Sequence, residues 1–105
     1  MSDSYCVILT TTPNHDDADQ LAELLVSRRL AACVQISQVA SCYRWQGRVI
    51  HEAECLLFIK TATRLYPDVE AAILENHTYE TPEIIQLPLT QGMGRYLGWI
   101  DENIK

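Results

Sequence analysis

The sequence predicts an α+β fold, and the pattern of its apolar residues supports this prediction in two ways. A long apolar stretch from Leu30 to Thr61 contains two alternating segments that meet at a single turn, at Gln46 and Gly47. Alternation interrupted by one glycine is typical of a β-hairpin. One helical and one strand-like segment lie on each side of this hairpin. The order β-α-β-β-α-β therefore predicts a ferredoxin-like sandwich, in which a four-stranded antiparallel sheet carries both helices on one face.

Each expected element has a local reason in the sequence. The elements are a strand over 5–11, a helix from 14 or 16 to 28–29, hairpin strands over 32–45 and 48–60, a helix over 67–77 and a strand over 84–89. Acids at 16, 17 and 19 suit the positive end of the first helix dipole. Pro67 fits a first helical turn. Pro88 is tolerated only at the edge of a sheet, so the last strand is expected at an edge.

A C-terminal helix is expected to complete the chain. Gly92 and Gly94 separate it from the last strand, and its apolar residues fall on a single stripe. These residues are Met93, Tyr96, Leu97, Ile100 and Ile104. The whole chain, 1–105, is expected to form one domain, because a chain of this length can bury a core without disulfides or metals.

Both sides of the sheet are expected to be apolar. In the segment from Cys55 to Ile59, residues of both parities are apolar, so both faces of that strand need cover. The helices can cover only one face, and the hairpin is longer than the outer strands can pair with. An apolar face and a projecting hairpin edge predict self-association.

The charge balance excludes some partners. Fourteen acids against eight bases give a net charge of −6, without a cluster of lysine or arginine. We therefore expect no nucleic-acid and no membrane partner. The N-terminal residues lack the basic and apolar regions of a signal peptide, so a cytoplasmic location is expected.

The four cysteines are expected to be buried free thiols. Each lies singly in an apolar segment, and none forms a CxxC pair. They are Cys6, Cys33, Cys42 and Cys55. This spacing argues against a zinc ribbon and against a dithiol redox motif.

The sequence predicts a binding protein and not an enzyme. No serine lies in a GxSxG setting, and no glycine-rich phosphate loop is present. His51 with Glu52 and Glu54 resembles half a metal site, but on a strand the two glutamates point to one face and His51 to the other. Similarly, the acids around His15 are explained as well by a helix start as by a cation site.

His77 is the best metal candidate in the sequence. Tyr79, Glu80 and Glu83 follow it closely, so a borderline-soft cation such as copper(II) would find nitrogen and oxygen ligands in one short loop. The alternative is a favourable interaction of its ring with the end of the preceding helix. One imidazole falls short of a closed ligand set, so copper is expected to bind weakly, and no metal or cofactor should be required for folding.

Several short strings occur in order along nearly the whole chain. They are LAACV (30–34), YRWQG (43–47), the spacing of Glu54 to Lys60 and Thr61, HTYETPEI (77–84), the pair Gln91 and Gly92, and YLGWI (96–100). Together they resemble the CutA divalent-cation tolerance proteins. The resemblance implies a ferredoxin-like subunit in a tight homotrimer, related in architecture to PII-type signalling proteins. It also implies a link to tolerance of copper and other divalent cations.

The same resemblance suggests which residues line clefts between subunits. These are Cys33, Trp45, Glu54, Lys60, Tyr79, Glu83 and Trp99. Such a mixture of aromatic and charged groups could hold a small ligand or form a polar seam of the trimer. The chain departs from the family in two places: residues 35–41 contain no proline, and Asn76-His77-Thr78-Tyr79 stands where many members have His-Pro-Tyr. Three roles stay open: a metal-responsive trimer, a PII-like small-ligand sensor and a trimeric scaffold.

Overall fold

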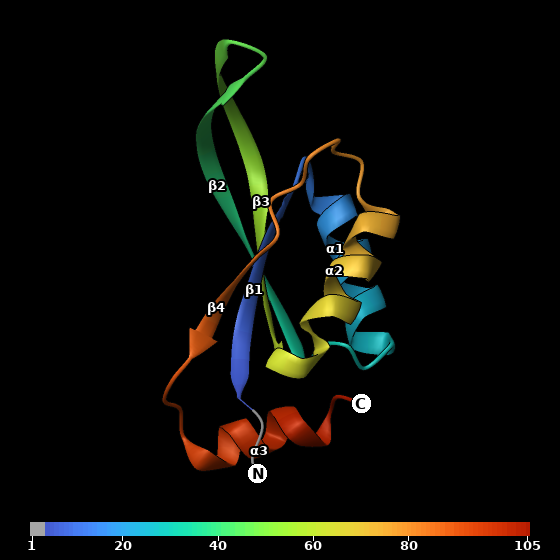
Figure 1. The fold of residues 1–105 in the computed structure, drawn as a ribbon. Helices are drawn as coiled ribbons and strands as arrows, with labels where there is room; N and C mark the ends of the chain where they lie inside the picture. Colours follow the sequence, from blue (N-terminus) through green and yellow to red (C-terminus); the bar gives the residue numbers. More distant parts are fainter. Residues whose placement is uncertain (1–3) are drawn as a thin grey trace.

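The computed structural model describes residues 4–105 and confirms the predicted order of elements (Figure 1). The strands are β1 (Tyr5–Thr12), β2 (Cys33–Trp45), β3 (Arg48–Ala62) and β4 (Ile85–Leu89). The helices are α1 (His15–Ser27), α2 (Tyr66–Asn76) and α3 (Gly94–Glu102), and a short 3-10 helix, Thr63–Leu65, precedes α2. No helix in this part of the chain is long and apolar enough to cross a membrane.

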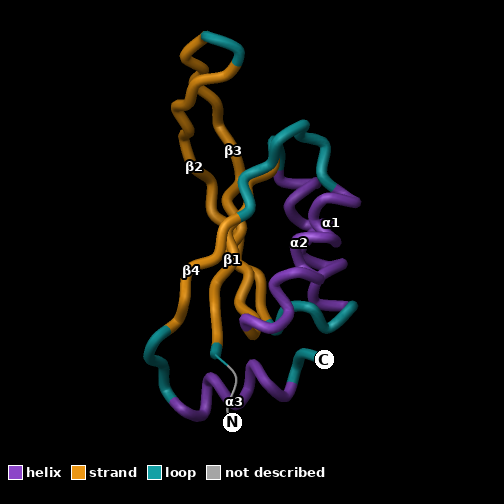
Figure 2. The backbone as a smooth tube through the Cα atoms, viewed as in Figure 1, coloured by secondary structure: helices purple, strands orange, loops and turns teal. Residues whose placement is uncertain are grey.

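The four strands form one antiparallel sheet in the order β2-β3-β1-β4, as a ferredoxin-like fold requires. The strand β4 lies at an edge, which confirms the position predicted from Pro88. Both α1 and α2 lie on the same face of the sheet (Figure 2). The start of α1 is fixed by Asn14, whose side chain accepts a hydrogen bond from the amide of Asp17 at 2.8 Å.

The main core lies between the sheet and these two helices. From the sheet it takes the side chains that point toward the helices, and from the helices their apolar stripes. Its largest fully buried members are Ile8, Leu25, Leu57, Ile59, Val69 and Ile73. Burial of each such side chain stabilises the fold by about 1.5–3 kcal/mol relative to an exposed one.

The opposite face of the sheet is also apolar, which confirms the prediction of two apolar faces. Leu9 and Phe58, directly paired across β1 and β3, are only half-buried there. On the edge strand, Ile85 and Leu87 remain 47% and 46% exposed. Because α1 and α2 pack on the other side, this face is left without a cover of its own.

The hairpin projects beyond the rest of the sheet. The strand β1 pairs with β3 only as far as the Thr12–Cys55 pair, so residues 39–45 and 48–54 continue as a two-stranded ribbon. At its tip, Gln46 and Gly47 both have positive φ angles, 49° and 80°, as in a tight two-residue hairpin turn. The predicted turn is therefore confirmed, and the chain measures 47 Å along its longest axis but only 25 and 22 Å across it.

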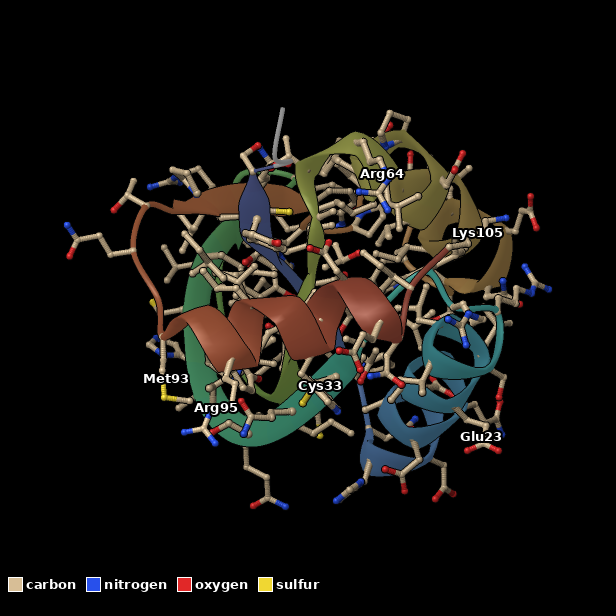
Figure 3. The ribbon with its side chains drawn as sticks, turned by 90° about the horizontal axis from the view of Figure 1, so that it is seen from below. Glu23, Cys33, Arg64, Met93, Arg95 and Lys105 are labelled. Carbon is tan, nitrogen blue, oxygen red and sulfur yellow. The ribbon has the colours of Figure 1, made fainter. Side chains whose placement is uncertain are left out.

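The C-terminal helix α3 lies across the end of the sheet opposite the hairpin tip (Figure 3). Ile100 and Ile104 bury their side chains in a second cluster with Ala62 and Leu65. The guanidinium of Arg29 donates to the Glu102 carbonyl at 2.9 Å, which ties the helix to the end of α1. The labelled Arg64 donates to the carbonyl of Lys105 at 2.7 Å (Figure 3).

The apolar stripe expected for the C-terminal helix is only partly buried in one subunit, since Met93 is 63% and Tyr96 36% exposed. The prediction that all four cysteines are buried is wrong. Among the cysteines, Cys55 and Cys6 are buried, but Cys33 is only half-buried and Cys42 is exposed. The reason for the exposure of Cys42 is its position on the ribbon, past the point that the helices reach.

Candidate functional site

A cleft of about 700 Å³ lies at the root of the projecting hairpin. One wall comes from the ribbon, with Tyr43, Trp45 and Glu54, and the other from the loop over residues 78–83. The strand side chains reach the cleft because alternate residues of a strand point to the same face. The loop side chains reach it because the chain crosses from α2 to the open face of the sheet before β4 begins (Figure 1).

A buried carboxylate and a tyrosine join the two walls. Glu54 is only 8% exposed, and the hydroxyl of Tyr79 donates to its Oε2 atom at 2.7 Å. Burial raises the pKa of Tyr79 above its usual value, and the hydrogen bond to Glu54 and the charge of that carboxylate raise it further. The phenol therefore stays protonated and serves as a donor, which partly compensates the buried charge.

A second tyrosine repeats this pairing on the exposed part of the ribbon. Tyr43 donates its hydroxyl to Glu52, and this hydrogen bond is the main cause that raises the pKa of Tyr43 to about 12. The hydroxyl groups of Tyr43 and Tyr79 therefore each donate a hydrogen bond to a glutamate carboxylate. The carboxylates of Glu52 and Glu54 lie on one face of the strand, as the alternation predicted.

The charged residues that line the cleft are all acidic. Glu54, Glu80 and Glu83 line it, whereas none of its lining residues in the described chain is lysine or arginine. However, no group of three His, Cys, Asp or Glu residues between 4 and 105 is placed to hold a metal ion. The cleft attracts cations without offering a closed coordination site.

His77 lies beside the cleft, with both ring nitrogens in contact with the backbone. Its Nε2 atom lies 2.5 Å from the carbonyl oxygen of Thr11, and its Nδ1 atom accepts from the amide of Tyr79 at 3.1 Å. These contacts fit a neutral ring with its proton on Nε2, because a carbonyl can only accept. His77 therefore fastens the loop to β1, and a metal bound at Nδ1 would have to displace the Tyr79 amide.

The other residues named by the family resemblance fall into two groups. Trp45, Glu54, Tyr79 and Glu83 line the cleft together. Cys33, Lys60 and Trp99 instead lie at the opposite end of the sheet, near α3.

This second group is organised around Tyr96. Lys60 donates to the Tyr96 hydroxyl at 3.3 Å and lies 5.4 Å from the centre of its ring. The rings of Tyr96 and Trp99 stack, with their centres 5.6 Å apart. Within one subunit, therefore, the predicted residues form two sites at opposite ends of the hairpin.

Two residues of the cleft with defined contacts, Tyr43 and Thr11, were not among the site residues predicted from the sequence. Tyr43 could have been found, because it shares parity with Trp45 on a strand whose turn was known. Thr11, which is buried at the cleft and contacts His77 through its carbonyl, gave no signal, since backbone contacts leave no trace in residue type.

We predict that the Tyr79→Phe variant is destabilised by about 1–3 kcal/mol at neutral pH, because it leaves a buried carboxylate without its donor. In the unfolded chain Tyr79 ionises near pH ~10, below its pKa in the folded protein, so its contribution is complete below pH ~10 and is lost as pH rises further. The unfolding free energy of the variant should therefore fall less than that of wild type between about pH 8 and about pH 11.

Denaturant unfolding at both pH values measures these differences, and Tyr43→Phe is the control. Its hydroxyl also donates to a glutamate, but in an exposed position. An equal loss of stability in the two variants would contradict the special role of the buried pair.

Comparison with known proteins places the whole chain in one family. The family described as "CutA1 divalent ion tolerance protein" matches residues 6–103. The "Divalent-cation tolerance protein CutA" of Thermus thermophilus is 43% identical over 98 residues, which are 92% of this chain and 95% of that protein. "Protein CutA, chloroplastic" of Arabidopsis thaliana is 38% identical over 100 residues, 94% of this chain and 55% of the longer plant protein.

The fold agrees with this assignment. The solved structure of the "Periplasmic divalent cation tolerance protein CutA" from Archaeoglobus fulgidus superimposes with a TM-score of 0.94 at 31% identity. The match covers 96% of this chain and 99% of that structure. The residues of the cleft and the ferredoxin-like sheet that carries them thus belong to a member of the CutA1 divalent ion tolerance family.

Proposed function

We propose that this protein is a cytoplasmic homotrimer that takes part in the tolerance of divalent cations, and that it acts by binding and not by catalysis. The observation that carries the proposal is the acidic cleft with its buried Glu54 carboxylate. Relatives named for divalent-cation tolerance support the same role.

Glu54 gives the cleft its preference for cations. A carboxylate that is 8% exposed and accepts a single phenolic hydrogen bond is short of compensating charge. Glu80 and Glu83 add negative charge on the opposite wall. Divalent cations that prefer oxygen ligands would relieve this imbalance, but they would be bound weakly, because most of their ligands would be water.

The surfaces that a single subunit leaves uncovered support self-association, and the number of three subunits comes from the family resemblance. The open sheet face carries half-exposed Ile85 and Leu87, and among residues 4–105 no third strand pairs with the two strands of the ribbon. Packing three subunits through these surfaces removes apolar area from water. It would also allow the Trp45 end of one hairpin to meet the Lys60 and Trp99 end of another.

The cytoplasmic location is supported by the cysteines. All four are free thiols, and Cys42 is exposed, which suits a reducing compartment. The names of two relatives carry the words "chloroplastic" and "Periplasmic", so membership of the family does not by itself set the location.

A small-ligand sensor is the second candidate function. Three aromatic side chains, Tyr43, Trp45 and Tyr79, line the cleft beside the glutamates. Aromatic faces and carboxylates together favour an organic cation, such as an ammonium group. A thermal-shift screen of amines against metal salts would separate this role from metal binding, and stabilisation by neither class would favour a trimeric scaffold.

We predict that wild type has a mass in solution of three 11.9 kDa subunits, and that the double variant Ile85→Glu/Leu87→Glu is a monomer. Two carboxylates buried without partners in the interface would cost several kcal/mol per trimer contact. Size exclusion with light scattering measures both masses.

The control for this experiment is Leu74→Glu, which places a single carboxylate on α2. Leu74 is 56% exposed but lies on the helical side of the sheet. It should leave the trimer intact. A monomeric wild type, or a double variant of unchanged mass, would contradict the proposed assembly.

Copper(II) binding at His77 stays a prediction, and the structure explains why it should be weak. Ligation at Nδ1 must replace the hydrogen bond from the Tyr79 amide, so we expect an affinity of about micromolar or weaker. Isothermal titration should show lower copper affinity for His77→Ala than for wild type. His15→Ala is the control, because His15 is exposed and its Nδ1 atom lies 3.3 Å from the carboxylate of Asp19, far along the chain from the loop of His77. Equal affinity in wild type and His77→Ala would exclude His77 as a ligand.

A further inference from the structure

A cysteine and a histidine face each other on the projecting ribbon, and the cysteine also borders the cleft. Cys42 and His51 are direct partners in the register of β2 and β3. Both are exposed, and the Sγ atom of Cys42 lies 3.8 Å from the Nε2 atom of His51. Because strand side chains alternate, this pair points to the face opposite Tyr43 and Glu52.

The separation of the two atoms is the one that a shared metal ion would impose. Metal–sulfur and metal–nitrogen bonds in zinc sites are about 2.3 Å and 2.0–2.1 Å long. At an angle of about 120° these bonds place sulfur and nitrogen about 3.8 Å apart, and at the tetrahedral angle about 3.5 Å. The ion would thus fit between the two atoms with little or no change in either side chain.

The surroundings leave room for such an ion. The neighbouring pair on the same face, Ala40 and Ala53, is small, and a hollow of about 320 Å³ opens beside it. Water or a further ligand can complete the coordination there. Two charged residues lie close to the pair in the register. Arg44 is two positions after Cys42 on β2 and therefore on the same face, and Glu52 borders the hollow.

We propose that Cys42 and His51 form a binding site for a thiophilic divalent cation of the zinc class. Thiolate and imidazole ligands select such ions over magnesium and calcium, which prefer oxygen. As the metal–sulfur bond forms, the Cys42 thiol releases its proton to solvent, and the neutral His51 ring donates the lone pair of Nε2. Two protein ligands make the site open and exchangeable, unlike closed four-ligand structural sites.

This site is independent of the proposed function of the cleft. It uses sulfur and nitrogen where the cleft offers carboxylate oxygen, and it opens onto a second hollow that His51 borders, although Cys42 also borders the cleft. Both of its ligands come from one subunit, and His77 is not among them. The cobalt titration and the light-scattering experiment therefore test the two proposals separately.

Cobalt(II) titration of the reduced full-length protein tests the site, because thiolate ligation of cobalt gives a charge-transfer band in the near ultraviolet. We expect this band in wild type and its displacement by zinc. Cys42→Ser should abolish it, and His51→Ala should weaken binding by at least about tenfold, since even residues behind the ligands contribute that much. Cys33→Ser and His15→Ala are the matched controls and should keep the wild-type band and affinity.

Circular dichroism checks the fold of each variant, and Cys42→Ala is a second variant should serine disturb the ribbon. Absence of the band in wild type at saturating cobalt would overturn the proposal. Its persistence in Cys42→Ser, or an unchanged affinity in His51→Ala, would also overturn it.

Discussion

The difference in length between the hairpin and the rest of the sheet determines most of this structure. The strands β2 and β3 have 13 and 15 residues, whereas β1 has eight and β4 five. The turn at Gln46 and Gly47 fixes the register of the long pair, because a slip of one residue would turn its core face to solvent. The excess length then has to project as a ribbon, and the cleft forms where the ribbon leaves the sheet.

Alternation gives the two faces of the ribbon different chemistry. One face carries aromatic rings and carboxylates, including Tyr43 and Glu54, and the other carries the Cys42–His51 pair. The loop after α2 closes the first face through two bonds: Tyr79 donates to Glu54, and His77 contacts the Thr11 carbonyl. His77 therefore has a structural role whether or not it also binds metal. On the second face, the exposed Cys42–His51 pair does not fasten a loop in this way.

The fold could be predicted because periodicity and turn chemistry determine it locally. The order of strands, the turn and the edge position of Pro88 all follow from residue type and spacing. The pairing of Cys42 with His51 also follows from counting back from the turn. The contacts of His77 could not be predicted, because they involve backbone atoms brought together by the loop. The exposure of Tyr96 could not be predicted either, since an apolar stripe looks the same whether it faces a core or another subunit.

In the proposed trimer, neighbouring subunits stabilise the ribbon, since an isolated two-stranded hairpin is marginally stable in water. Native-state hydrogen exchange of the amides in 39–45 and 48–54 tests this stabilisation directly. We expect the paired amides of the ribbon to be protected nearly as strongly as those of β1, in the core of the sheet. Rapid exchange throughout the ribbon, in a protein whose β1 amides are well protected, would contradict it.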